Sequence, residues 1–429
     1  MAKTEKKKIG LTTRIFISLL LGAILGVFLH YCVLPNDAVQ NILVDGVFYV
    51  VGQGFLRLMQ MLVVPLVLCS LICGASAIGD TKTLGKVGVR TVVFYIITTA
   101  LAVAVALTVA RIINPGVGMD LNTLEVAETQ IATTQTSMVD TLLDIIPKNP
   151  IEALATGNML QIIVFAIIVG IILAKLGDKT QIVHNLFQQG NDIMMEMTMM
   201  VMSLAPIGVF CLIARTFSGM GFDAFQPLIK YMFAVMLALV IQCLGVYQIL
   251  LKVFTGLNPI RFIKKFLPVM GFAFSTATSN ATIPLSIDTL ERKMGVSRRI
   301  SSFTIPLGAT INMDGTSIMQ GVAVVFIAQA YGIALTPMDY LTVIATATLA
   351  SIGTAGVPSV GLVTLSMVLT SVGLPIEGIG FIMGIDRILD MSRTAVNITG
   401  DAVCTTIVAN QNQALDKEVF NKKEAELEA

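Results

Sequence analysis

The residues best suited to bind a ligand lie on one predicted helix near the C-terminus, within residues 376–410. Five of its polar residues follow one another in steps of 4, 3, 4 and 4: Asp386, Asp390, Arg393, Asn397 and Asp401. On a helix they fall within a sector of about 80°, and Thr394 widens the sector to about 100°. We call these six residues the polar seam. Because charge is costly in apolar surroundings, the seam must face the protein interior.

The side chains of the seam suit a ligand that carries both signs of charge. Arg393 offers a planar guanidinium to a carboxylate, and Asp390 offers a carboxylate to an ammonium group. Thr394 and Asn397 can hold a second carboxylate, and Asp401 is a candidate cation ligand. The pattern predicts binding of an acidic amino acid. A structural charge ladder is the alternative, whereas a voltage sensor would repeat charges of one sign.

A second candidate site surrounds Asp314, which is the only charged residue between Ile300 and Met338. A carboxylate within an apolar segment of a membrane protein indicates a functional site. Its neighbours favour a break in the helix that would free carbonyl oxygens: Asn312, Met313, Gly315 and Thr316. Carbonyls together with one carboxylate suit a hard cation such as Na⁺. The alternative is a structural aspartate paired with a neighbouring helix.

Two further apolar stretches are interrupted by small polar residues and a proline. They are FSTATSNATIP (Phe274–Pro284) and ASIGTAGVP (Ala350–Pro358). Free backbone groups survive at membrane depth only inside protein or beside a wet cavity, and paired breaks of this kind indicate a transporter site. We therefore predict two re-entrant helical hairpins, near residues 258–292 and 334–372. Ordinary turns outside the membrane are the alternative.

The composition indicates the kind of protein in which these motifs sit. The 429 residues are 55% hydrophobic and 13% charged, with a mean hydropathy of +0.84. Soluble domains carry about 25% charge, so the chain is predicted to be a polytopic membrane protein in contact with lipid. The 28 basic and 27 acidic residues give no reason to expect a nucleic-acid partner. We find no hydrolase, metalloprotease or P-loop motif, so we do not expect an enzyme.

The apolar segments and their loops predict the membrane topology. Ile15–Leu34 reads as a retained first span, and further apolar segments lie near residues 47–78, 87–113, 151–175, 191–217 and 225–254. Lys and Arg cluster in alternate loops, which places the N-terminus in the cytoplasm. The charged tail after Asn410 is expected to be cytoplasmic and frayed at the end of the chain.

Three motifs together resemble one known family. GATINMDGTS (308–317), ASIGTAGVP (350–358) and GIDRILDMSRTAVNITGD (384–401) are similar to the glutamate/aspartate transporters of the dicarboxylate/amino acid:cation symporter family. The resemblance implies an all-α fold of eight transmembrane helices plus two re-entrant hairpins, built from inverted repeats. It also implies a homotrimer in the cell membrane, in which each protomer moves a transport domain like an elevator against a scaffold.

The resemblance also implies how the chain divides. Residues 1–80 and 114–217 would form the scaffold. Residues 85–113, 225–254 and 258–410 would form the transport domain, and residues 411–429 the cytoplasmic tail.

The same resemblance implies the binding residues. The substrate amino group would lie on Asp390, its side-chain carboxylate on Arg393, and its main carboxylate on Thr394 and Asn397. The hairpin tips and the segment after Asp314 would add further substrate contacts: Thr278, Ser279, Thr316, Ala355, Gly356 and Val357.

Three sodium sites are implied in the same way. The first would use Gly308, Asn312, Asn397 and Asp401. The second would use Thr310, Met313, Ser351, Ile352 and Thr354. The third would use Tyr95, Thr98, Thr99, Asn312 and Asp314.

These observations predict a symporter that couples inward Na⁺ flow to uptake of L-aspartate or L-glutamate. A proton-coupled or C4-dicarboxylate symporter of the same fold is the alternative within this class. From another class, an ion channel would require a continuous pore with ring-like ligands, and the seam of mixed charge does not supply one.

Overall fold

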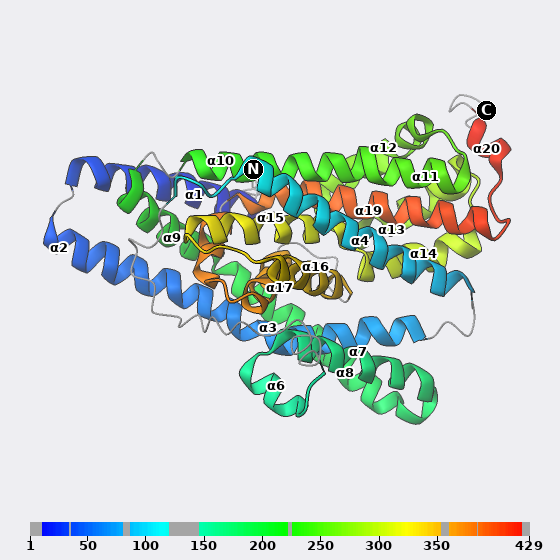
Figure 1. Ribbon diagram of the computed structural model, residues 1–429, viewed down its shortest axis with the longest axis horizontal. Helices are drawn as coiled ribbons and strands as arrows, with labels where there is room; N and C mark the ends of the chain where they lie inside the picture. The colour runs from blue at the N-terminus through cyan, green and yellow to red at the C-terminus, as the bar shows by residue number, and fades with distance from the viewer. Residues whose placement is uncertain are drawn as a thin grey trace, which may run out of the picture.

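The computed structural model describes residues 11–33, 36–79, 86–119, 146–221, 225–352, 360–383 and 385–422. In this part of the chain the regular elements are helices, and they run along the long axis of the molecule (Figure 1). The N-terminal half contains α1 (Leu11–Phe28), α2 (Asp37–Val39), α3 (Tyr49–Gly79), α4 (Lys86–Ile113), α6 (Pro150–Thr156), α7 (Met159–Leu176), α8 (Gln181–Ser203) and α9 (Ala205–Met220). The predicted all-α fold is confirmed.

The C-terminal half follows with shorter, more often interrupted helices. It contains α10 (Phe225–Val240), the π-helical segment η5 (Ile241–Val246), α11 (Tyr247–Thr255), α12 (Pro259–Thr276), α13 (Ser279–Asp288), α14 (Arg298–Ile311), α15 (Asp314–Ala330), α16 (Pro337–Ser351), α17 (Val360–Ser371), α18 (Ile379–Met383), α19 (Asp386–Gln411) and α20 (Lys417–Asn421).

Five helical stretches in the described residues are long and apolar enough to cross a membrane. They are Asp37–Ser76, Val87–Ile113, Gln161–Ser203, Phe225–Thr255 and Arg298–Ala330. Several of them expose large apolar side chains, such as Ile97 and Ile112 of α4. Water would disfavour such surfaces, whereas lipid does not. The prediction of a multi-pass membrane protein is therefore confirmed.

The helices pack as two groups. In one group α1 packs on α9, and α3 packs on α7, α8 and α9. In the other, α4 packs on α10, α15 and α16, while α19 is surrounded by α11, α12, α14 and α15 (Figure 1). The groups touch chiefly where α17 meets α3 and α7, and where α18 meets α9. The helix that carries the polar seam is thus at the centre of the second group.

The predicted breaks in the apolar segments are present. Asn258 caps α12 by accepting hydrogen bonds from the backbone of Ile260 and Arg261, and Pro259 opens the helix. The helix ends at Ala277, whose φ of 51° is left-handed, and α13 starts at Ser279 and packs back against α12. In the second hairpin α16 ends at Ser351 and packs on α17. Residues 353–359 of its tip lie outside the described residues.

The expectation of a frayed tail after Asn410 is wrong for residues 411–422, which are part of the described structure. Lys265 of α12 is buried, and its Nζ donates hydrogen bonds to the carbonyls of Lys293 (2.6 Å), Phe420 (2.9 Å) and Val419 (3.2 Å). Phe420 is fully buried, and its ring faces the same ammonium group. The tail therefore docks on the first hairpin, since burial of Phe420 and three charged hydrogen bonds offset its loss of freedom.

Replacing Lys265 by methionine should release this tail. The carbonyls of residues 293, 419 and 420 would lose a charged donor, and we expect the free energy of unfolding to fall by about 2 kcal/mol. Limited proteolysis with an antibody against the C-terminus measures the release, and thermal unfolding measures the stability. Lys264→Met is the matched control, because the neighbouring Lys264 is exposed. Equal protease resistance in the two variants would contradict the docking role of Lys265.

Candidate functional site

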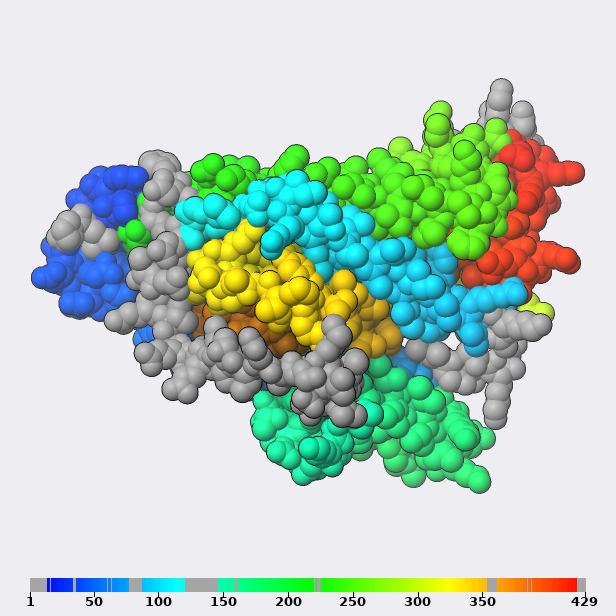
Figure 2. All heavy atoms as spheres, viewed as in Figure 1, coloured from blue at the N-terminus to red at the C-terminus, as the bar shows by residue number. Residues whose placement is uncertain are grey.

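The polar seam of α19 is buried, as predicted. All six residues are under 9% exposed, and Arg393 is 1% exposed. On one face of the molecule, the atoms of α4 lie between those of α10–α12 and those of α16 (Figure 2). Helix α15, which packs on α4 and α19, is itself buried, so the seam lies beneath an outer layer of helices. Such a position is costly for charged groups unless they are paired or bind a ligand.

Arg393 is held by two carboxylates of its own helix. Its Nη1 lies 2.6 Å from Oδ1 of Asp386, and its Nη2 lies 2.8 Å from Oδ1 of Asp390. Thr394 donates to the carbonyl of Asp390 at 2.9 Å. The sequence placed Asp386 on the seam without a role, and its spacing of seven residues from Arg393 was the available signal. These two ion pairs fix the orientation of the guanidinium. Its Nε has no hydrogen-bond partner in the described structure.

The break between α14 and α15 lies directly against the seam. Asn397 accepts a hydrogen bond from the backbone N–H of Gly315 at 2.7 Å, and its amide lies 3.2 Å from Sδ of Met313. A Cβ on Gly315 would lie 2.6 Å from the carbonyl oxygen of Arg393. Only glycine permits this approach, so residue type at 315 decides whether the two helices can meet.

The residues of the first predicted cation site come together. Asn312 donates from Nδ2 to Oδ1 of Asp401 at 2.9 Å and to the carbonyl of Asn397 at 3.3 Å. A Cβ on Gly308 would lie 2.3 Å from the Asp401 carboxylate and 2.5 Å from the Tyr95 hydroxyl. Oδ1 of Asn312 is buried and has no partner in the described structure. The cluster offers one carboxylate and neutral oxygens, which suit Na⁺.

In the third predicted site Asp314 and Thr99 come together, and two residues that the sequence did not indicate join them. Oδ1 of Asp314 accepts from Thr99 at 2.5 Å. Oδ2 accepts from Tyr247 at 2.7 Å and from Gln242 at 3.3 Å. These two residues lie on α11 and η5, far from Asp314 in the sequence, and no motif marked them.

Of the other three predicted members of the third site, Asn312 bonds Asp401 and Asn397, and the hydroxyls of the remaining two donate to backbone carbonyls. Tyr95 donates to the carbonyl of Thr304 at 3.2 Å. Thr98 donates to the carbonyl of Tyr95 at 3.1 Å. Both residues are buried beside Thr99 on α4, so they line the same region.

The second predicted cation site is described only in part. Ser351 at the end of α16 donates to the carbonyl of Ile311 at 2.5 Å and accepts from the N–H of Met313 at 3.1 Å. The second hairpin is thereby fastened to the break beside Asp314. Ile352 follows it and is buried, whereas Thr310 bonds within its own helix, to the carbonyl of Pro306. Thr354 lies outside the described residues.

Of the predicted substrate contacts, the structure describes those of the first hairpin and Thr316, but not those at the tip of the second hairpin. Thr278 and Ser279 begin α13, which packs on α14 and α19. Thr316 is buried, and a Cβ on Gly361 of α17 would lie 2.9 Å from its methyl group and 3.6 Å from Nη2 of Arg393. Helix α17 thus closes over Thr316 and Arg393. Ala355, Gly356 and Val357 lie outside the described residues.

The balance of buried charge indicates what the region can bind. Asp314 and Asp401 accept hydrogen bonds only from neutral groups among the described side chains: Thr98, Thr99, Gln242, Tyr247 and Asn312. A buried carboxylate without a cationic partner is strongly disfavoured in its charged form, so each of these two calls for a bound cation or a proton. The described residues contain no cluster of three His, Cys, Asp or Glu that could hold a metal ion.

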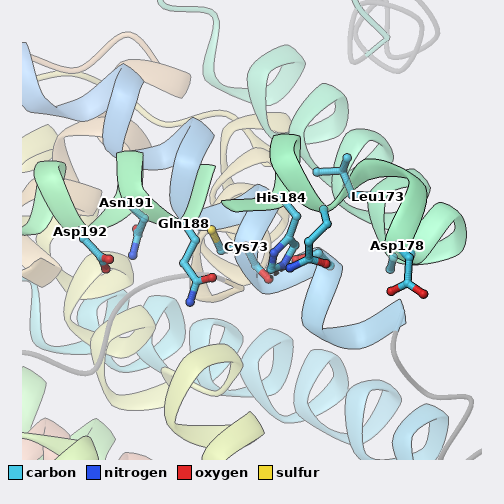
Figure 3. A pocket seen from close by; sticks show the side chains of 11 residues that line it. Cys73, Leu173, Asp178, His184, Gln188, Asn191 and Asp192 are labelled. Carbon is cyan, nitrogen blue, oxygen red and sulfur yellow. Dashed lines mark hydrogen bonds between the residues drawn. The ribbon is translucent and has the colours of Figure 1, made fainter. Parts of the chain in front are cut away.

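A separate polar cavity of about 520 Å³ lies between α3, α7 and α8 (Figure 3). Cys73, His184, Gln188 and Asn191 point toward its middle, and Asp178 and Asp192 lie toward opposite ends. No residue of the seam and no predicted cation ligand lines it. We therefore place the candidate site at α19, where the charged groups converge, and not in this cavity.

Apolar spans around a buried, charged seam are typical of a solute transporter of the membrane. The chain belongs to the sodium:dicarboxylate symporter family, whose model matches residues 11–411. Its relatives are symporters, so the protein is a transporter and not an enzyme.

Curated relatives cover almost the whole chain. A proton/sodium-glutamate symport protein of Bacillus caldotenax is 38% identical over 98% of this chain and 99% of its own. A proton/glutamate-aspartate symporter of Escherichia coli is 35% identical over 96% of this chain and 94% of its own. Excitatory amino acid transporter 3 of mouse is 32% identical over 96% of this chain and 86% of its own.

Proposed function

We propose that this protein couples inward flow of Na⁺ to uptake of L-aspartate or L-glutamate across the cell membrane. The observation that carries the proposal is the set of buried charges: the guanidinium of Arg393, and the carboxylates of Asp314 and Asp401, which accept hydrogen bonds only from neutral groups among the described residues. An acidic amino acid supplies a carboxylate that binds Arg393, and cations compensate the negative charges of Asp314 and Asp401.

The substrate binds between α19 and the two hairpins. Arg393 binds the side-chain carboxylate, Asp390 the ammonium group, and Thr394 with Asn397 the main carboxylate. Asp386 and Asp390 both bind Arg393. When the side-chain carboxylate of the substrate binds the guanidinium, it takes the place of Asp390 there, and Asp390 then binds the ammonium group of the substrate. Both signs of charge on the substrate, its two carboxylates and its ammonium group, then have partners, which an uncharged or purely anionic solute cannot achieve.

Cation binding and substrate binding share the same pieces of backbone. Asn397 holds Gly315, Asn312 holds Asp401, and Ser351 ties the second hairpin to Ile311 and Met313. A cation that orders this break therefore favours closure of the hairpin over the substrate. Such linkage makes each ligand raise the affinity of the other and suppresses leak of either one.

The two packing groups support an elevator mechanism. The group around α19 carries all described candidate binding residues, and the group around α3 carries none. We assign residues 85–113, 225–254 and 258–410 to the moving body, and residues 1–80 and 114–217 to a scaffold that forms a homotrimer. Both termini are assigned to the cytoplasm from the distribution of Lys and Arg.

Uptake into proteoliposomes tests the function. Labelled aspartate should accumulate above its external concentration when an inward Na⁺ gradient is imposed, because the cation gradient supplies the free energy. Accumulation driven by a proton gradient alone would contradict sodium coupling and favour the proton coupling named for several relatives. Equilibration without accumulation would indicate a channel.

Competition distinguishes the two substrate classes. Unlabelled glutamate should reduce aspartate uptake strongly, whereas succinate should reduce it weakly, since succinate has no ammonium group for Asp390. Stronger competition by succinate than by glutamate would favour the C4-dicarboxylate alternative.

A further inference from the structure

We propose that Gln242 and Tyr247 are positioning residues that occupy one oxygen of the Asp314 carboxylate and thereby present the other oxygen to the coupling cation. The inference rests on the proposed sodium coupling and adds two residues that act through Asp314. Neither residue belongs to the motifs that indicated the cation sites.

The hydrogen bonds to Asp314 are divided unequally between its two oxygens. Tyr247 Oη, at 2.7 Å, and Gln242 Nε2, at 3.3 Å, both donate to Oδ2. Thr99 donates to Oδ1, and the neighbouring Thr98, whose hydroxyl donates to the carbonyl of Tyr95, also lies within reach of the carboxylate. A carboxylate oxygen has two lone-pair directions, so Oδ2 is saturated and Oδ1 retains capacity. A cation can therefore bind at Oδ1, on the side of Asp314 that Thr99 faces.

Close packing prevents the Tyr247 hydroxyl from turning away. A Cβ on Gly400 of α19 would lie 2.5 Å from Tyr247 Oη and 2.8 Å from Asn312 Nδ2. The hydroxyl is thus wedged between the backbone of α19 and Asp314, next to the amide that holds Asp401. Tyr247 consequently touches the surroundings of both carboxylates, which gives it a position from which one cation site can influence the other.

The amide of Gln242 is retained at an energetic cost. It is fully buried, and its Oε1 has no hydrogen-bond partner in the described structure. An unpaired buried acceptor costs about 1–3 kcal/mol, so an apolar side chain would fill this space more favourably. What the amide supplies is its N–H, which bonds Asp314 and, at 3.4 Å, the carbonyl of Thr98. It therefore ties the carboxylate to the α4 segment that lines the same site.

Two variants test the proposal without removing Asp314. Tyr247→Phe deletes one donor and keeps the ring, and Gln242→Met deletes the other and keeps the shape. In purified protein without substrate, we expect the Na⁺ concentration that gives half-maximal protection against thermal unfolding to rise about tenfold in each. The aspartate affinity at saturating Na⁺ should stay within about threefold of the wild-type value, because neither residue contacts the substrate residues.

The matched control is Gln248→Met. Gln248 is also a buried glutamine of the same helical stretch, but its Nε2 donates to the carbonyl of Cys243 and not to a carboxylate. Its Na⁺ midpoint should stay at the wild-type value. Gly400→Ala is a supporting variant and not an independent one: its Cβ displaces the Tyr247 hydroxyl without deleting it and also crowds the Asn312 amide, so it should raise the midpoint as well.

Several outcomes would overturn the proposal. Na⁺ midpoints of Tyr247→Phe and Gln242→Met equal to that of Gln248→Met would exclude a positioning role. A loss of aspartate affinity that persists at saturating Na⁺ would indicate general structural damage instead. If one variant does not fold, the other and Gly400→Ala decide. A wild-type protein that gains no protection from Na⁺ would overturn sodium coupling itself, which distinguishes failure of the proposed function from failure of this inference.

Discussion

Replacement of Arg393 by cysteine is expected to weaken aspartate binding by at least a hundredfold. The variant leaves Asp386 and Asp390 facing a space without the guanidinium that lies 2.6 and 2.8 Å from them. The acidic substrate then adds a third carboxylate with no cation to receive it. Removing one partner of a buried charge pair costs about 3 kcal/mol or more, and each 1.4 kcal/mol is a factor of about ten.

Binding calorimetry and uptake measure the effect, with serine and alanine as test solutes. These small neutral amino acids need only the contacts of the ammonium and main carboxylate, so they should lose less affinity than aspartate or gain some. Arg298→Cys is the control, since that guanidinium is exposed and bonds Glu291 at the surface. Unchanged aspartate affinity in the Arg393 variant would remove Arg393 from the substrate site.

Gly315→Ala is expected to abolish coupled uptake. Within a helix, alanine would ordinarily stabilise by about 0.5–1 kcal/mol relative to glycine. Here the added Cβ would lie 2.6 Å from the carbonyl oxygen and 2.9 Å from the Cα of Arg393, and 3.0 Å from Oδ1 of Asn397. Backbone atoms cannot give way as a flexible side chain can, so α15 must move from α19 at a cost of about 1–3 kcal/mol. The Gly315–Asn397 hydrogen bond is lost with this movement.

Transport and its activation by Na⁺ should both fail in this variant, since the break between α14 and α15 links the substrate site to the cation sites. We expect the initial rate of aspartate uptake to drop at least a hundredfold, with protein still present in the membrane. Gly271→Ala is the control, because a Cβ there meets nothing within 4 Å. Retention of wild-type uptake by Gly315→Ala would show that α15 and α19 need not approach so closely.

The predicted elements followed from local patterns. The tip after Phe274 was predicted because small polar residues and a proline interrupt an apolar run, and the chain does leave α12 at Ala277. The break at Asn312 and Met313 was predicted from residues that release backbone carbonyls, and α14 ends at Ile311. In each case the cause lies within a few residues, so it can be read without knowledge of the fold.

Partners from distant segments could not be predicted in the same way. Asp314 binds Tyr247 and Gln242, 67 and 72 residues away. Lys265 binds carbonyls near residue 420, which corrected the expectation of a frayed tail. The segments around Gln242, Tyr247 and Lys265 have the periodicity and composition of any buried helix. Nothing near these residues in the sequence therefore marks them as partners of a distant group.

The sequence by itself determined that this protein crosses a membrane and carries a charged seam on its last long helix, because hydropathy and helical spacing are properties of consecutive residues. Arg393 pairs with Asp386 and Asp390 of its own helix, at spacings that the sequence shows. Tertiary structure alone decided the partners of the other two buried carboxylates: Asp314 and Asp401 are left to neutral donors from α4, η5, α11 and the break between α14 and α15. The reason is physical: the free energy of a buried charge depends on every group within a few ångströms, and packing brings those groups from distant parts of the chain.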